Sequence, residues 1–396
     1  MATPHLNPPP PPHRTLRIGT RSSALALAQV TLFTTLLSQK IPAPHLPPTT
    51  TYPIHTSLGD TNKTTDLHTL ASGGKSLWTE DLETELREGR VDVIVHSMKD
   101  VPTLLPRGCV CASVGAREEA RDAVVLGPRW CQGGEMGGMG VQGLGDLPQG
   151  SVVGTSSVRR AAMVRRVFPG LVIKDVRGNV GTRLRKLDDY EKEGFDALVL
   201  AGAGVQRLGL EGRISAVLGR EDGVLHAVGQ GALGLEWREG DEWVEGILEM
   251  VGRGKVERRV RWECVAERSL LRALEGGCSV PVGVDCVWED GEAPEQLDER
   301  KEEITKENEG YEADDALPSS AAADQEHGGF LSLRAMVVSL DGRQCVEGCK
   351  RRYVMSDAAA EEVAWQMYKE LVDKGAEEIL KGIRLNREMI EGQDNA

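Results

Sequence analysis

Long apolar runs are absent from this sequence. No stretch approaches the ~20 consecutive apolar residues that a membrane-spanning helix needs, so we expect no membrane partner. The N-terminal residues also lack the hydrophobic core of a secretory signal peptide. Hydrophobic residues still make up 40% of the 396 residues, which is the composition of a folded protein. We therefore expect a folded chain that acts in the cytoplasm.

Paired cysteines are lacking as well. The eight cysteines form no CxxC pair, and no His/Cys cluster has the spacing of a zinc site. This pattern predicts reduced thiols and no metal site.

Basic residues are in deficit, and the formal net charge is -14. Residues 289–326 alone hold 15 acidic and 3 basic residues, which leaves 46 acidic and 44 basic residues elsewhere. The acidic balance thus describes one low-complexity segment, and we predict a disordered insertion at about 289–328. The rest of the chain is nearly neutral, so we expect no nucleic-acid partner. A Pro-rich stretch at 1–13 is predicted to be a disordered arm.

A strand–turn–helix pattern is present, and it occurs twice. Apolar runs at 16–19 and 151–154 lead through Gly-Thr and small hydroxyl residues into helical patterns at 22–37 and from 158. The repeat predicts two similar α/β domains, each with a helix N-terminus at the carboxyl edge of its sheet, where anions bind.

The remaining segments extend this α/β prediction. A Gly- and Met-rich stretch at 129–150 is predicted to be a surface loop. After residue 254, a long helix, short strands and a helix at 358–380 predict a smaller C-terminal α/β domain.

Arginines gather on the Gly- and Ser-rich turns beside the helix starts. They are Arg21, Arg159, Arg160, Arg177, Arg183 and Arg207. A cation at a helix N-terminus opposes the helix dipole, so this placement is favourable when an anion lies between the guanidinium groups. Phosphate and carboxylate both match guanidinium geometry, so the arginines leave the kind of anion open.

Two further residues could take part in chemistry. Asp100 follows a buried strand at 91–96 and adjoins Lys99, where a carboxylate can stabilise a developing cation or move a proton. Cys278 lies on a loop shaped by two glycines and Pro281. Taken alone, Asp100 is equally consistent with a turn former, and Cys278 with an inert thiol.

Two nucleotide-binding motifs are approached but not completed. Residues 73–76 look like the end of a P-loop, but Thr69 stands at the position of its first glycine. Residues 202–207 approach a dinucleotide fingerprint, but Arg207 stands where Gly or Ala is needed. We therefore expect neither ATP nor NAD as a cofactor.

Together these segments resemble the porphobilinogen deaminase (hydroxymethylbilane synthase) family. The matching runs occur in family order over about residues 14–285, and include VHSMKDVPT at 95–103 and LEGGCSVP at 274–281; the others are 16–26, 153–161, 177–188 and 227–233. The resemblance implies a monomer with two domains similar to periplasmic binding proteins and a third, smaller domain. Their implied limits are 14–118 with 229–253, then 119–228, then 254–396.

The resemblance also implies a reaction. Four porphobilinogen molecules would be joined head to tail with loss of ammonia, on a dipyrromethane cofactor that a thioether attaches to Cys278. Water would then release hydroxymethylbilane, a precursor of heme and other tetrapyrroles. Asp100 would be the catalytic residue that stabilises the cation left when ammonia departs.

The remaining implied site residues bind acidic side groups of the pyrroles. Besides Cys278, which would hold the cofactor covalently, those implied for the cofactor are Lys99, Thr155, Ser156, Arg159, Arg160, Arg183 and Gly178. Those implied for the substrate are Arg21, Ser23, Arg177, Arg207, Lys75 and Gln230. Six rings with two carboxylates each carry roughly twelve charges, which explains the need for many arginines.

Two other functions explain part of the sequence. A non-catalytic anion-binding protein would need the arginines but neither Asp100 nor Cys278. An adaptor that recruits a partner would explain the acidic segment 289–326 and nothing else. The extra N-terminal arm and the longer loops at 129–145 and 289–328 depart from the family pattern, but they touch none of its motifs.

Overall fold

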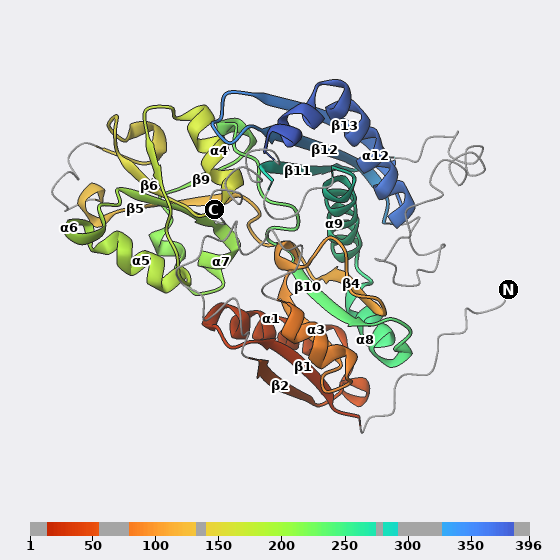
Figure 1. The fold of residues 1–396 in the computed structure, drawn as a ribbon. Helices are drawn as coiled ribbons and strands as arrows, with labels where there is room; N and C mark the ends of the chain where they lie inside the picture. Colours follow the sequence, from red (N-terminus) through yellow and green to blue (C-terminus); the bar gives the residue numbers. More distant parts are fainter. Residues whose placement is uncertain (1–13, 55–78, 132–139, 275–279, 292–326, 384–396) are drawn as a thin grey trace, which may run out of the picture.

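The structure is a computed structural model, and it describes residues 14–54, 79–131, 140–274, 280–291 and 327–383 (Figure 1). The described part contains two five-stranded sheets and one three-stranded sheet, with helices packed on them. The predicted α/β class is confirmed. No described helix is both long enough and apolar enough to cross a membrane.

The first sheet has the strand order β2-β1-β3-β10-β4. Its strands are β1 (Leu16–Arg21), β2 (Thr49–Ile54), β3 (Val93–Ser97), β4 (Cys109–Val114) and β10 (Leu233–Arg238). β1 is parallel to β2 and β3, whereas β10 runs antiparallel to β3 and β4. The chain therefore leaves this sheet after β4, builds the second sheet, and returns at β10.

Helices cover both faces of the first sheet. Side chains alternate between the two faces of a strand, so Val93 and Ile94 enter different cores. Val93 packs with α1 (Ala24–Lys40) and α8 (Glu242–Gly252), whereas Ile94 packs with α3 (Glu80–Arg87). β3 is consequently buried along its whole length, and a short 3-10 turn follows directly at its carboxyl end.

The second sheet repeats this arrangement, with the order β7-β6-β8-β5-β9. Its strands are β5 (Asp122–Leu126), β6 (Val152–Gly154), β7 (Val172–Lys174), β8 (Ala197–Ala201) and β9 (Ala216–Leu218). Its helices are α4 (Val158–Val167), α5 (Val180–Asp188), α6 (Tyr190–Glu193) and α7 (Gly202–Gln206). In each sheet three parallel strands are followed by an antiparallel strand that enters from the other sheet.

The stretch at 129–150 is not wholly the surface loop that its composition predicts. Trp130, Leu144 and Leu147 are buried in the core of the second sheet. Short 3-10 helices, η3 (Pro128–Trp130) and η5 (Leu144–Asp146), carry two of these anchors. Large apolar side chains thus fix both ends of the stretch, a feature that its Gly and Met content conceals. Residues 132–139 lie outside the described part.

The third sheet is antiparallel and consists of β11 (Val282–Glu289), β12 (Gly329–Val338) and β13 (Cys345–Val354). Helices α9 (Lys255–Ala273) and α12 (Asp357–Asp373) share its hydrophobic core. The prediction of one helix at 358–380 is wrong, because Gly375 adopts φ +96° and a separate helical segment follows at 376–383. Most of the predicted acidic insertion, residues 292–326, lies outside the described residues.

Short 3-10 turns complete the connections: η1 (Ala43–His45), η2 (Met98–Asp100), η6 (Glu211–Arg213) and η7 (Arg220–Asp222). The predicted domain limits, 14–118 with 229–253, 119–228 and 254–396, stay a prediction.

Candidate active site

The carboxyl end of β3 carries Lys99 and Asp100 in the η2 turn. Lys99 is half-buried and Asp100 is exposed. The segment that returns to the first sheet packs against this turn, since a Cβ on Gly229 would lie 2.8 Å from Met98 Cγ and 3.0 Å from the backbone nitrogen of Lys99. Gly229 also has φ +68°, so glycine is the residue that allows this close approach. Asp100 therefore projects from a turn that is packed tightly from behind.

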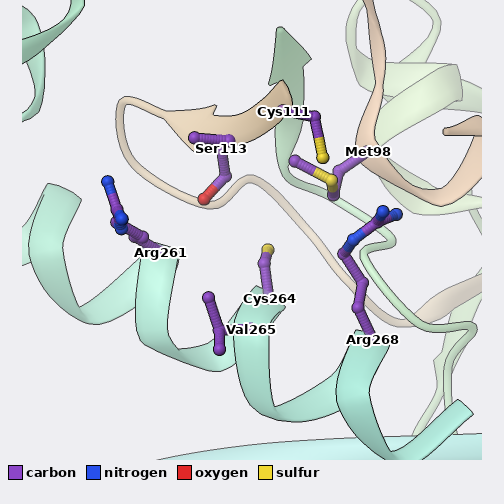
Figure 2. A pocket seen from close by; sticks show the side chains of 8 residues that line it. Met98, Cys111, Ser113, Arg261, Cys264, Val265 and Arg268 are labelled. Carbon is purple, nitrogen blue, oxygen red and sulfur yellow. The ribbon is translucent and has the colours of Figure 1, made fainter. Parts of the chain in front are cut away.

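Helix α9 holds the chain just after the same turn. Arg268 donates from Nη1 to the Val101 carbonyl at 3.2 Å and from Nη2 to the Pro102 carbonyl at 2.8 Å. Figure 2 shows the cavity that lies between α9 and the first sheet beside this contact, lined among others by Met98, Cys111, Ser113, Cys264 and Val265. The turn that bears Asp100 is thus tied to the helix of the third sheet.

The start of α4 carries two of the predicted arginines, and both bind Asp122. Arg159 Nη1 lies 2.7 Å from Asp122 Oδ2, and Arg160 Nε lies 2.8 Å from Asp122 Oδ1. All three side chains are buried. Burial alone would raise the pKa of Asp122, but the two guanidinium groups hold it well below its usual range. Asp122 is therefore an ionised carboxylate between two cations.

Gln230 joins this cluster to Lys99. Its side-chain oxygen lies 3.1 Å from Arg160 Nη2 and 3.4 Å from Lys99 Nζ. Burial, with the nearby positive charge of Arg160 and Arg159, lowers the pKa of Lys99 to about 8, although Asp100 and Asp122 oppose the shift. The structure thus brings Lys99, Gln230, Arg159 and Arg160 together, while their roles in binding stay a prediction.

The loop before α5 adds further cations to this region. Gly178 has φ +109°, and the Arg183 Nε group donates to its carbonyl at 2.7 Å. Burial, with Arg160 and Arg177 nearby, lowers the pKa of Arg183 to about 10. Arg177 itself pairs with Asp175 at 3.0 Å. Arg183 thus lies in a region of positive potential that an anion would relieve.

The smaller hydroxyl residues mostly serve the local backbone. Ser23 caps α1 by accepting from the Ala26 nitrogen at 3.3 Å. Ser156 donates to the Val176 carbonyl at 2.8 Å, and Thr155 is buried beside it. Arg21 is the last residue of β1, at the edge of the first sheet where β3 also ends. These four residues occupy the predicted strand–turn–helix connections.

Arg207 bridges the two large sheets. Its side chain is 4% exposed, and it pairs with Glu118 at 2.5 Å. It also donates to Ser97 Oγ at 3.3 Å, at the end of β3, and to the Gly231 carbonyl at 3.0 Å. In this structure its guanidinium group therefore binds the protein on several sides.

Two predicted site residues cannot be placed. Cys278 and Lys75 lie outside the described residues. Their roles stay predictions that rest on the sequence. Within the described ranges, no three His, Cys, Asp or Glu side chains gather as metal ligands.

Asp122, which pairs with two of the predicted site arginines, is a residue that the sequence analysis did not single out. A usable signal existed, because three buried strands are introduced by an aspartate: Asp92 before β3, Asp122 at the start of β5 and Asp196 before β8. Each of the three is buried and ion-paired with arginine. Nothing in the local pattern distinguishes the one that binds Arg159 and Arg160.

Two family descriptions match this chain. Residues 16–246 match "Porphobilinogen deaminase, dipyromethane cofactor binding domain", and residues 262–317 match "Porphobilinogen deaminase, C-terminal domain". This chain belongs to the porphobilinogen deaminase family. A porphobilinogen deaminase of Neurospora crassa is 39% identical over 378 residues, covering 94% of this chain and 95% of that protein. One of Prochlorococcus marinus is 38% identical over 368 residues, covering 93% and 96%.

Solved structures of other proteins are less similar. The periplasmic VFT2 domain of BvgS from Bordetella pertussis is 12% identical, covers 64% of this chain and 94% of its own, and aligns with a TM-score of 0.34. A periplasmic binding protein of Salmonella typhimurium is also 12% identical, covers 62% and 97%, and aligns with a TM-score of 0.32. Likenesses of this degree say nothing about what this chain binds.

The residues present fit the dipyrromethane cofactor of the family. Its rings carry several carboxylates, so its site needs more positive than negative charge. Lys99, Arg160 and Arg183 all have a pKa lowered by burial, and neighbouring cations add to each shift. The nearby acids do not restore these pKa values, and a bound polycarboxylate would raise them by stabilising the charged forms.

Proposed function

We propose that this chain joins four porphobilinogen molecules head to tail with loss of ammonia, and then releases hydroxymethylbilane by hydrolysis. Family membership supports the reaction. The observation that carries it is one juxtaposition: exposed Asp100 follows Lys99 in a single turn, and Lys99 is joined through Gln230 to Arg160 of α4. A carboxylate beside a cationic surface matches a substrate that is both anionic and a source of developing positive charge.

Asp100 would be the catalytic residue. Its exposed carboxylate can accept a hydrogen bond from a pyrrole N–H group and stabilise positive charge as ammonia leaves. Lys99, Thr155, Ser156, Gly178 and the arginines 159, 160 and 183 would hold the cofactor carboxylates. Arg21, Ser23, Lys75, Arg177, Arg207 and Gln230 would bind the incoming substrate.

Cys278 would be the tether of the cofactor. When bound, dipyrromethane supplies the free pyrrole position to which the first substrate is joined. Two buried cysteines of the described part are poor candidates, because burial raises the pKa of Cys109 to about 11 and that of Cys264 to about 12. Protonated thiols of this kind are weak nucleophiles, so they do not compete with the motif cysteine for the attachment.

Intact mass of the purified protein tests the tether. We expect an excess equal to one dipyrromethane in the wild type, its loss in Cys278→Ala, and its retention in Cys131→Ala, a matched change at an exposed thiol. An active wild type without extra mass would exclude the cofactor assignment. The same measurement excludes a non-catalytic anion-binding protein, which would carry no covalent pyrrole.

Turnover of porphobilinogen tests the role of Asp100. Asp100→Asn should bind substrate but turn over at least ~100-fold more slowly, because removing a group that stabilises transition-state charge typically costs 10²–10³ in kcat. Asp188→Asn, at a surface ion pair with Arg213, is the control and should stay near the wild-type rate. Near-normal turnover in Asp100→Asn would remove Asp100 from the mechanism.

We also propose a monomer that acts in the cytoplasm. The seven cysteines of the described part are all free thiols, which agrees with a reducing compartment. Sedimentation velocity and cell fractionation test the two statements separately.

A further inference from the structure

Asp122 lies where the chain passes from the first sheet to the second. It is the first residue of β5, the strand that follows β4 in the sequence and enters the second sheet (Figure 1). Its side chain is fully buried. A carboxylate in such a place is tolerated only when its oxygens accept several hydrogen bonds, and here every donor belongs to the candidate site.

Four hydrogen bonds reach the Asp122 carboxylate. Oδ2 accepts from Arg159 Nη1 at 2.7 Å. Oδ1 accepts from Arg159 Nη2 at 3.2 Å, from Arg160 Nε at 2.8 Å and from Gln230 Nε2 at 2.9 Å. Two adjacent guanidinium groups of one helix turn would otherwise repel each other. The shared carboxylate therefore fixes both the distance between them and the direction of each.

Asp122 also sets the orientation of Gln230. The Gln230 amide donates from Nε2 to Asp122 and to the Ala120 carbonyl, which leaves its oxygen as the only acceptor of the side chain. That oxygen faces Arg160 Nη2 at 3.1 Å and Lys99 Nζ at 3.4 Å. Reversing the amide would point its NH₂ group at two cations. Asp122 is thus linked to Lys99, the neighbour of Asp100, through the side chain of Gln230.

We propose that Asp122 is a positioning residue of this site, which aims Arg159 and Arg160, and through Gln230 the ammonium group of Lys99, at the carboxylates of bound pyrroles. The inference rests on the proposed function. It predicts a change in anion affinity opposite in sign to the change expected from the charge of Asp122 alone. Removing a negative charge from a cationic site should tighten anion binding if Asp122 acts only through its charge, and should weaken binding if Asp122 orders the cations.

The test compares Asp122→Asn with Asp92→Asn. Asp92 is a matched control, because it is also fully buried at the entry to a strand and paired with several arginines, among them Arg17 at 2.7 Å, but it contacts none of the cations around Lys99. We expect Asp122→Asn to raise the KM for porphobilinogen about tenfold, the worth of about one charge-assisted hydrogen bond, with a smaller change in kcat. Asp92→Asn should leave KM within about twofold of wild type.

A second readout does not depend on turnover. The pH midpoint for acylation of Lys99, followed by mass spectrometry, should fall in Asp122→Asn, because Asp122 favours the charged form of Lys99. It should stay unchanged in Asp92→Asn. Loss of the dipyrromethane mass in Asp122→Asn, with retention in Asp92→Asn, would also support the inference.

Three results would overturn it: a KM equal to or lower than that of wild type in Asp122→Asn, the same rise of KM in both variants, or a Lys99 midpoint that does not move. If Asp122→Asn fails to fold, Gln230→Met takes its place. Gln230→Met keeps the Asp122–arginine pairs and the Asp122 charge but breaks the link to Lys99, so a KM equal to that of wild type in this variant would be equally decisive. A wild type with no turnover and no added mass would instead refute the proposed function, and the Lys99 midpoint would still test Asp122.

Discussion

Replacing Arg117 with methionine should lower the denaturant concentration at which the protein unfolds, and by more than the loss of an exposed ion pair does. Arg117 lies between β4 and β5, and its side chain is 10% exposed. Its Nη1 lies 2.8 Å from Glu263 Oε2 and 2.7 Å from Glu267 Oε1, both on α9. Its Nε donates to the Gln230 carbonyl at 2.9 Å. One side chain thus joins both connections between the large sheets to the third sheet.

The loss of stability in Arg117→Met follows from the buried carboxylate that it leaves without its guanidinium partner. Without Arg117, the fully buried Glu267 keeps the Gly229 N–H group, at 2.7 Å, but loses both of its guanidinium donors, which lie at 2.7 and 2.9 Å. Removing one partner of a buried ion pair typically costs ~3–5 kcal/mol. At roughly 2–3 kcal/mol per M of urea, the unfolding midpoint should fall by about 1–2 M. Tryptophan emission is a suitable signal, because Trp288 donates to Glu263 at 2.8 Å.

The dependence on pH has a definite sign. Burial works to raise the pKa of Glu267, but Arg117 holds it below its usual range. Without Arg117 the burial effect prevails, so the folded form binds a proton more tightly than the unfolded form, and folding is favoured as the pH falls. The stability gap between wild type and Arg117→Met should therefore be larger at pH 7 than at pH 5.

Two controls make this prediction sharp. Arg213→Met breaks an exposed pair with Asp188 and should cost at most ~1 kcal/mol. Changing Glu263 and Glu267 to glutamine in the Arg117→Met background should recover much of the loss, because no buried charge remains unpaired. A cost below ~1 kcal/mol for Arg117→Met, or a gap that is equal at both pH values, would refute the reasoning.

Three further predictions follow from single residues. Gly229→Ala should destabilise the protein by at least ~2 kcal/mol and slow turnover, because it adds a clash with the η2 turn to the strain of φ +68°. Gly240→Ala, at φ +74° with open space around it, should show the strain alone. Equal unfolding midpoints of the two variants would contradict this prediction. Arg17 holds the pKa of Asp92 at about 2 against the effect of burial, so ionised Asp92 should contribute ~2 kcal/mol to the free energy of unfolding above pH 4, and this contribution is lost as the pH falls toward 2. The difference in unfolding free energy between wild type and Asp92→Asn, measured in urea, should therefore shrink over that range. A constant difference would argue against the prediction. In protein that lacks the cofactor, the acylation midpoint of Lys99 should lie near pH 8, because burial and the neighbouring arginines lower its pKa. A Lys99 midpoint at about 10.4, the value of a free lysine side chain, would show that Lys99 is not in the desolvated, cationic site described.

The sequence determined the elements and the motifs of this protein. Strands such as β3 and helices such as α1 follow from runs and periods of apolar residues, and their ends agree with the prediction to within about three residues. The turns that bear Asp100 and Arg159 follow from the same local patterns. Where a local pattern was ambiguous, the prediction was wrong, as at Gly375, where one glycine in the left-handed region divides a helix.

Tertiary structure alone decided which charges meet. Arg159 and Asp122 are 37 residues apart, and Arg117 and Glu267 are 150 residues apart. Periodicity reports only which face of an element is buried, so it carries no information about partners on distant elements. Arginines that the sequence presents as a uniform anion-binding set thus divide in the fold. Arg207 pairs with the half-buried Glu118 and Arg159 with the buried Asp122, whereas Arg183 lies near Arg160 and Arg177. These pairings exist only when the strands of both sheets are in place.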